Sequence, residues 1–292
     1  MSADAVTNPA RRCSAAVNSF HSILYFAPDL DVELATRGVT DPMAAYLAGR
    51  AAPLGATGPG TVVAAFNAFA VPLVAQHIPA VWRVVTPDEA IAARLRAVHA
   101  LLEQLLGAEV LASPEIAEAA ALARRATQGC ARPGRPMYSA NADLDVPEAP
   151  HLALWHASTL LREYRGDAHV IALGHAELSG LEALVTDCAS PAGMPKELVM
   201  TKRGWSGVDW SGAERNLCER GLMDRTGALT AAGLRLREHI EDETDRLDRF
   251  PYECLGTEGT RRLTALAARF VGLAADAGAF PAVLREFFVP AA

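Results

Sequence analysis

Apolar residues recur every three or four positions along most of the chain, which is the spacing of one face of an α-helix. Alanine is abundant and runs of β-branched residues are few, so closely packed helices are favoured over sheets. Between Pro87 and Gly107 one apolar stripe follows this spacing, formed by Ile91, Leu95, Val98, Leu102 and Leu105. The chain is therefore predicted to be mainly α-helical.

Capping residues mark where several helices begin. The sequence TPDE at 86–89 is a capping box, in which Thr86 caps the helix and Glu89 reaches back to it. The sequence SPE at 113–115 opens a second predicted helix, which runs to about Thr127. An earlier helix is expected to start near Gly60 and to continue until Pro72 disturbs it.

The middle of the chain combines a predicted loop with the most polar predicted helix. Residues 129–150 are rich in proline and glycine, so they are expected to form a long ordered loop and a candidate pocket wall. His151 to Arg165 follows as a helix, which Gly166 is expected to interrupt or end. A second helix can then run from Asp167 to Leu173.

Beyond residue 178 the pattern changes to short helices separated by turns. One helix is expected to start at Ser179 and another to cover Ser211–Arg220. Gly221 can end the latter in a left-handed conformation, and Thr230 can cap the charged helix that follows. Further apolar residues at helical spacing predict a terminal helix that packs back on the protein or on a second subunit: Leu263, Leu266, Phe270 and Val271.

The order RGL at 220–222 followed by LTAAG at 229–233 resembles the winged-helix domain of MarR-type regulators. The resemblance covers about residues 178–249 and implies a recognition helix, a small β-wing and a following helix. The predicted fold is thus an N-terminal helical domain (1–176) with a polar, histidine-containing pocket, a winged-helix-like domain (177–250) with a short β-wing, and a C-terminal helical tail (251–292). Because MarR-type proteins dimerise through terminal helices, the resemblance also implies a homodimer.

Composition narrows the class of protein. Of 292 residues 51% are hydrophobic and 21% charged, so the chain can bury a core and is not disordered. No apolar run of bilayer length and no signal pattern is apparent, so no membrane partner is expected. Five cysteines without a CxxC pair argue against a disulfide framework and favour a reducing cytoplasm.

The charge balance weighs against DNA as a partner. The chain carries a net charge of −7, and phosphate binding needs a local positive excess. The predicted recognition helix, Ser211–Arg220, has no net charge, and the predicted wing at 226–229 has no basic residue. The winged helix is therefore expected to pack against the N-terminal half or to mediate dimerisation.

Candidate chemistry is concentrated between His151 and His175, which contain four of the eight histidines. His169 or His156 could exchange protons near neutral pH, oriented by Asp167 or Glu163. These four residues are the predicted catalytic set. Further residues are predicted to bind the substrate, with guanidinium groups holding an anion: Arg162, Arg165, His21, Tyr25, Arg50, Asn67 and Trp155.

Two other interpretations of this cluster stay open. The histidines could hold a metal, but their spacing matches no HExxH-like signature, so no metal is predicted. The arginines and acids could instead form a purely structural ion-pair network. The glycines at 55, 58 and 60 lack the lysine and the preceding strand of a phosphate loop, and no GxSxG or kinase motif occurs, so no cofactor is predicted.

Several motifs together resemble an actinobacterial family described as helix-turn-helix-like: residues 21–26, RAAPLG at 50–55, 151–170, RGW at 203–205 and RGL…LTAAG. That resemblance covers about residues 15–270 and implies a helical part joined to a winged helix, without a particular reaction. The leading hypothesis is a small-molecule-binding protein, a metal-free acid/base enzyme acting on an anionic or natural-product-like substrate between the two parts. The alternatives are a ligand-responsive winged-helix regulator and a non-catalytic interaction protein.

Overall fold

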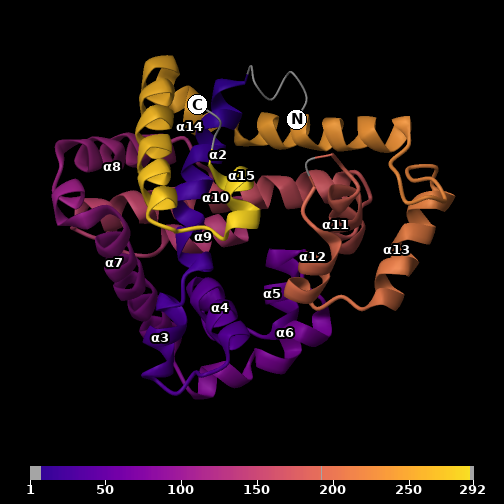
Figure 1. Ribbon diagram of the computed structural model, residues 1–292, viewed down its shortest axis with the longest axis horizontal. Helices are drawn as coiled ribbons and strands as arrows, with labels where there is room; N and C mark the ends of the chain where they lie inside the picture. Colours follow the sequence, from indigo (N-terminus) through magenta and orange to yellow (C-terminus); the bar gives the residue numbers. More distant parts are fainter. Residues whose placement is uncertain (1–7, 192, 290–292) are drawn as a thin grey trace.

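The computed structural model describes residues 8–191 and 193–289, and this part of the chain is built from helices (Figure 1). In chain order the elements are α2 (Pro9–Ser22), η1 (Ile23–Phe26), α3 (Asp29–Ala35), α4 (Pro42–Ala51), η2 (Ala52–Leu54), α5 (Pro59–Phe66), α6 (Val71–His77), η3 (Ala80–Arg83), α7 (Pro87–Leu111), α8 (Pro114–Thr127), α9 (Pro136–Ala142), α10 (Pro150–His175), α11 (Gly180–Cys188), α12 (Lys196–Arg203), α13 (Gly207–Glu219), α14 (Ala231–Asp276), η4 (Ala282–Leu284) and α15 (Arg285–Phe288).

The helices confirm the prediction of a mainly α-helical chain. Capping side chains explain where several of them begin. Thr86 and Glu89 form the predicted capping box at the start of α7. Ser179 caps α11 with Glu182 in the same reciprocal way. Thr230 accepts a hydrogen bond from the amide of Gly233 and so caps α14. Each cap satisfies amide groups that have no partner inside the helix.

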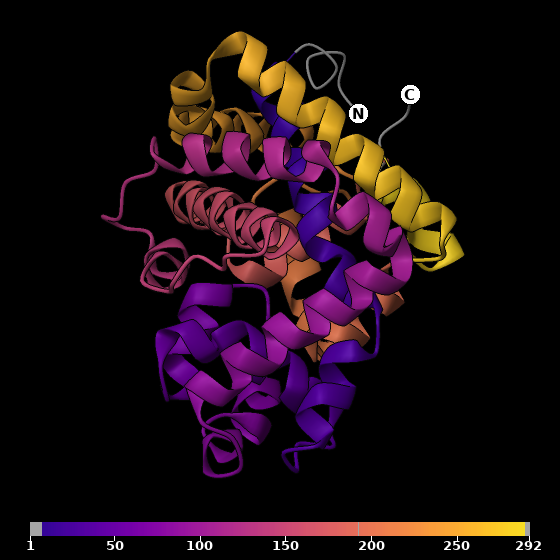
Figure 2. The ribbon, with the colours of Figure 1, turned by 90° about the vertical axis from the view of Figure 1, so that its left-hand side faces the viewer.

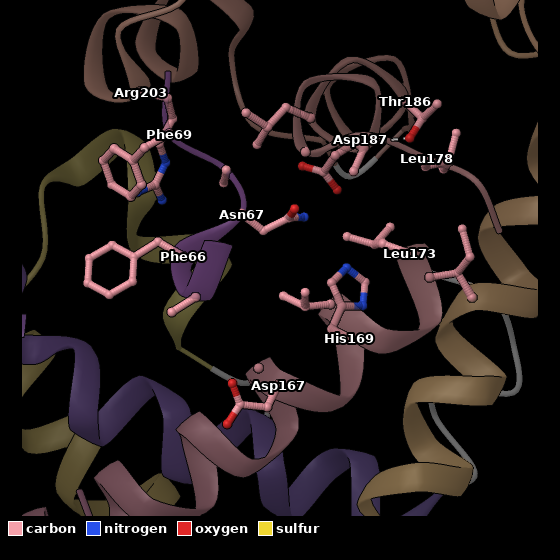
Figure 3. Close-up of a pocket in the computed structure, with 18 of the residues that line it drawn as sticks. Phe66, Asn67, Phe69, Asp167, His169, Leu173, Leu178, Thr186, Asp187 and Arg203 are labelled. Carbon is pink, nitrogen blue, oxygen red and sulfur yellow. Dashed lines mark hydrogen bonds between the residues drawn. The ribbon is translucent and has the colours of Figure 1, made fainter. Parts of the chain in front are cut away.

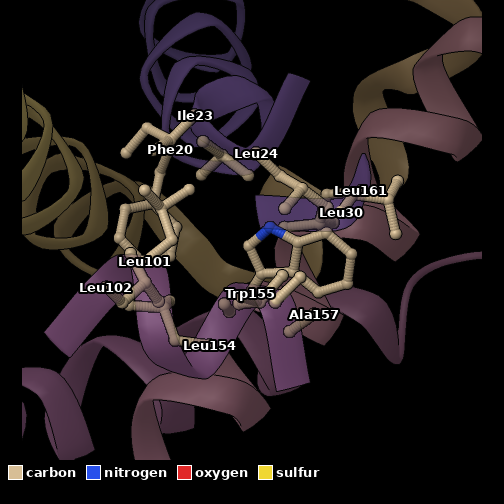
Figure 4. Packing of buried hydrophobic residues seen from close by; sticks show 14 of the residues in the cluster. Phe20, Ile23, Leu24, Leu30, Leu101, Leu102, Leu154, Trp155, Ala157 and Leu161 are labelled. Carbon is tan, nitrogen blue, oxygen red and sulfur yellow. The ribbon is translucent and has the colours of Figure 1, made fainter. Parts of the chain in front are cut away.

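The largest hydrophobic core surrounds the first half of α10. This helix packs against α2, α8, α9 and α14, and Figure 2 shows α8 next to it and the C-terminal part of α14 next to α8. Trp155 is almost fully buried among side chains from several helices (Figure 4). Phe20 of α2 also contacts Phe270 of α14, with ring centroids 6.4 Å apart, so the C-terminal part of α14 packs back on the same chain.

A second, smaller core belongs to α11, α12 and α13. Trp210 and Leu217 of α13 are its most buried members, and they pack with Val185 of α11. The end of α10 and the start of α14 contribute to the same core through Leu173 and Ile240. Thus α10 enters both cores and joins the helical body to the α11–α13 unit.

The α11–α13 unit also docks on the loop between α5 and α6. The indole of Trp205 donates a hydrogen bond to the carbonyl of Ala68 (3.0 Å). The amide of Ala70 donates to the carbonyl of Arg203 (2.9 Å), the last residue of α12. Gly180, the first residue of α11, lies so close to the Asn67 carbonyl that a Cβ atom would overlap it.

The predicted β-wing is wrong. Within the described residues no strand is found, and a single antiparallel bridge between Met223 and Leu229 stands where the wing was expected. The Asp224 carboxylate accepts the amides of Thr226 and Ala228, which closes a tight turn. Because Thr230 is already the cap of α14, no residues are left to extend the bridge into a ladder.

Three helix boundaries also differ from the prediction. Helix α10 runs unbroken through Gly166, because a single glycine costs only about 1 kcal/mol and the surrounding residues are buried. Helix α5 ends at Phe66, before Pro72, since Asn67 adopts a positive φ of 57°. Helix α7 bends at Gly107 and continues to Leu111, and the predicted loop at 129–150 contains α9.

Gly180→Ala should destabilise the protein by about 1–3 kcal/mol, because the new methyl group would push α11 away from the Asn67 carbonyl. Gly272→Ala in α14 is the matched control, since nothing lies within 4 Å of its Cβ position. That substitution should be neutral or stabilise by up to about 1 kcal/mol. Urea unfolding of both variants measures the difference, and equal free energies of unfolding would contradict the close contact.

Candidate functional site

A cavity of about 270 Å³ lies where the helical body meets the α11–α13 unit (Figure 3). One wall comes from α4 and the α5–α6 loop, and the floor comes from the second half of α10. The opposite wall is formed by α11 and by the first half of α14, and Arg203 at the end of α12 lines the cavity beside Phe69. Six of the residues predicted from the sequence line it: Arg50, Asn67, Arg162, Glu163, Asp167 and His169.

Glu163 is the centre of the buried charges at the deep end of this cavity. Nη2 of Arg50 lies 3.4 Å from its Oε2 atom, and Nη1 of Arg162 lies 2.6 Å from the same oxygen. Burial alone would raise the pKa of Glu163, but the charges of Arg162 and Arg50 outweigh it and lower the pKa to about 2. Glu163 is therefore ionised and shared between two guanidinium groups.

Further guanidinium groups in this region have no carboxylate partner among the described residues. Arg94 is 2% exposed and donates to the carbonyl of Gly49 and the amide oxygen of Asn141, both neutral acceptors. Arg203 lies over the Phe69 ring, with its guanidinium carbon 4.3 Å from the centroid. The deep end thus carries more positive than negative charge.

His21, Tyr25 and Trp155 form a buried aromatic group beside these charges, outside the cavity lining. The His21 ring stacks on Trp155, with centroids 5.1 Å apart, and Tyr25 meets it edge-on at 5.3 Å. Thr159 donates its hydroxyl proton to the Trp155 carbonyl, so Nδ1 of His21 must donate to the Thr159 oxygen. Burial and the nearby Arg162 lower the pKa of His21, which keeps it neutral and leaves its Nε2 atom without a partner.

His169 lies on the opposite side of the cavity, where Figure 3 shows its ring pointing into the open space. The Thr244 hydroxyl donates to the Ile240 carbonyl (2.7 Å), so Nδ1 of His169 donates to Thr244 (3.0 Å). Burial lowers the pKa of His169 despite the Glu241 carboxylate nearby. The neutral ring therefore carries its lone pair on Nε2, and its use as a base stays a prediction.

Asp167 and His156 make contacts that differ from those predicted. Asp167 accepts the backbone amides of Met137 and Tyr138 at the start of α9, at 3.4 and 2.9 Å. Burial raises its pKa to about 6 even though the amide of Tyr138 stabilises the charge. His156 is buried on α10 outside the cavity lining, and burial together with the Arg94 charge lowers its pKa to about 4.

Arg165 belongs to an ion-pair network that joins α10 to α14. Its guanidinium lies 2.7 Å from Asp245, 3.2 Å from Glu241 and 3.4 Å from Asp248. Arg11 of α2 pairs with the other oxygen of Asp245 (2.7 Å). Arg165 therefore makes the contacts expected of a structural ion-pair network, and it does not line the cavity.

The structure therefore separates the predicted residues into three groups. Six line the cavity, the aromatic group of His21, Tyr25 and Trp155 lies behind its deep end, and Arg165 and His156 serve other contacts. Sequence reasoning missed Arg203, Arg237 and Asp187 as cavity residues. Only the RGW motif at 203–205 drew attention to this region, and nothing in it indicated contact with residues 67–70.

Helices α12 and α13 form a helix-turn-helix. They are joined by Gly204-Trp205-Ser206, and Gly204 takes the left-handed conformation (φ 73°, ψ 23°) that lets the chain turn. The outer side of α13 exposes Ser211, Arg215 and Asn216, whereas Trp210 and Leu217 face the small core. In architecture, then, this is a helix-turn-helix attached to a larger helical body.

Comparison with known protein families also indicates a helix-turn-helix protein. Residues 10–281 match a family described as the helix-turn-helix family, and the chain belongs to it. Comparison with curated proteins gives no match. Comparison with solved structures gives none either. Of the described helices, none has both the length and the apolar character needed to cross a membrane.

His156→Gln should flatten the pH dependence of stability between pH 6.5 and 4. The unfolded state binds a proton to this imidazole below pH 6.5, whereas the folded state binds it only near pH 4. Stability is therefore lost as the pH falls through this range, by about 1.4 kcal/mol per pH unit for one proton. Unfolding free energies of both proteins across this range measure the slope, and parallel curves would show that His156 is not kept neutral by folding.

Proposed function

We propose that the protein is a DNA-binding regulator whose cavity senses a small molecule. The family assignment and the α12–α13 geometry support DNA as a partner, against the expectation from net charge. The observation that carries the sensing part is the shared wall: Arg203 ends α12, one residue before the helix-turn-helix turn, and it also lines the cavity. A ligand there would touch both the body and the DNA-binding unit.

The coupling follows from the two docking contacts of the α11–α13 unit. The indole of Trp205 and the carbonyl of Arg203 bond to the α5–α6 loop, and Asn67 of that loop lines the cavity. A ligand that binds better in one arrangement of loop and unit shifts the population toward it. The position of α13 relative to the body is therefore the variable that the ligand changes.

Few cations are free to contact phosphates near α13. Lys196 pairs with Glu214 (3.0 Å), and Arg220 donates to the carbonyls of Glu177 and Ala176 at the end of α10. Lys202, Arg215, Arg225 and Arg235 are exposed and form no ion pair among the described residues. Because the salt dependence scales with the number of neutralised phosphates, DNA binding by one unit should show the salt dependence of at most about four phosphate contacts.

A homodimer is part of this proposal, because paired units would read two half-sites one helical turn apart. Exposed apolar side chains of the C-terminal region support it: Leu273, Val283 and Phe287. Light scattering of the purified protein tests this part separately from DNA binding.

Arg215→Ala should weaken binding to DNA selected from random duplexes by about 1–3 kcal/mol, since an arginine of the recognition helix contacts base edges. Arg261→Ala is the matched control, because Arg261 is exposed on α14 and pairs with Glu258. Fluorescence anisotropy of labelled duplex measures both. Failure to enrich any sequence, or equal loss in both variants, would overturn the DNA-binding proposal.

A further inference from the structure

The deep end of the cavity has a surplus of positive charge: Arg50 and Arg94 are buried, whereas Arg162 and Arg203 are partly exposed. Arg50, Arg162 and Arg203 line it, and Arg94 lies behind it, while Glu163 is the one carboxylate in ion-pair contact with any of them among residues 8–191 and 193–289. A buried guanidinium without a counter-charge is costly. Nη1 of Arg162 is buried and makes no hydrogen bond, although it touches Glu163.

The other acids of the cavity wall are already engaged. Asp187 pairs with Arg237 (2.9 Å), and Glu241 pairs with Arg165 (3.2 Å). Asp167 accepts two backbone amides of α9. None of the three neutralises the deep end, so the missing negative charge has to come from outside the chain.

The opposite part of the cavity carries apolar side chains beside His169 and the Asp187–Arg237 pair. Val170 and Leu173 of α10 line it together with Leu178, Ala183 and Leu184 around α11. Figure 3 shows Leu173 and Leu178 on the side away from Arg203, with the Asn67 carboxamide between the two ends. That carboxamide has no partner among the hydrogen bonds of the described residues, so it can donate to or accept from a ligand.

We propose that the cavity binds a small organic carboxylate, with its acidic group held by Arg162 and Arg203 and its apolar body against Val170, Leu173 and Leu178. The inference rests on the proposed sensing function and names the ligand class for it. A cavity of about 270 Å³ has room for one ring or a short chain. The carboxylate brings the counter-charge, and the planar guanidinium groups suit its two oxygens.

Isothermal titration with straight-chain and aromatic monocarboxylates, each beside its primary amide, tests the ligand class. The best acid should bind at least about tenfold more tightly than its amide, because the amide lacks the charge that the arginines need. Inorganic phosphate should bind more weakly than that acid, since it lacks the apolar body. Equal binding of acid and amide, no binding of any acid, or tighter binding of phosphate would overturn the proposal.

Variants locate the site. Arg162→Gln and Arg203→Gln should each weaken binding of the best acid by about tenfold or more. Arg237→Gln is the matched control in the same cavity, because its charge is already neutralised by Asp187 and its loss should change the affinity less. Circular dichroism melts confirm that each variant is folded, and equal losses in all three would place the anion elsewhere.

Tyr46 gives a readout in the unmodified protein. Burial raises the pKa of this phenol, but Arg50, Arg203 and Arg162 outweigh it and lower the pKa to about 8. The four other tyrosines have raised pKa values: Tyr25, Tyr138, Tyr164 and Tyr252. The ultraviolet titration of Tyr46 is therefore separate from theirs. A bound carboxylate offsets the arginine charges and should raise the Tyr46 pKa, whereas an unchanged titration under saturating acid would contradict this site.

The two proposals can fail separately, because none of these measurements contains DNA. Carboxylate binding without any selected DNA sequence would refute the regulator and keep the ligand site. DNA binding that is selective, together with equal affinity for acid and amide, would refute the ligand class and keep the regulator.

Discussion

The site depends on the ion pairs that Glu163, in the middle of α10, forms with two arginines. Glu163 is 2% exposed and lies against Arg50 and Arg162, while Arg94 and Arg203 add charge nearby without acids of their own. Removing this carboxylate would leave the buried Arg50 and the partly exposed Arg162 without an acid, which is more costly than losing a surface ion pair. The same ion pairs give the cavity a positively charged end. They therefore affect both the stability of this region and the charge that a ligand would meet there.

Helix α10 connects this region to both hydrophobic cores. Trp155 near its start is buried in the large core, and Leu173 near its end belongs to the small core of α11–α13. The cavity lies on the stretch between them, where the Asn67 loop meets Arg203 and α11. A molecule bound there would contact residues of both packed units.

Sequence reasoning predicted local structure better than long-range contacts. The caps at Thr86, Ser179 and Thr230 were readable because their hydrogen bonds join residues three positions apart. The break expected at Gly166 was wrong because burial of its neighbours overrides the preference of one glycine, and the β-wing was wrong because the turn is too short. Arg203 could not be recognised as a cavity residue, since its partner Phe69 is far away in the sequence.

Comparing the stabilities of Glu163→Gln and Arg162→Gln without ligand tests whether positive charge is in excess around Glu163. Glu163→Gln should destabilise the protein by about 3–5 kcal/mol, because it leaves the guanidinium groups unpaired. Arg162→Gln should be nearly neutral or stabilising, since Arg50 still pairs with Glu163 and one surplus charge is gone. If denaturant unfolding shows that both substitutions destabilise equally, the charges are balanced as they stand, and the account is wrong.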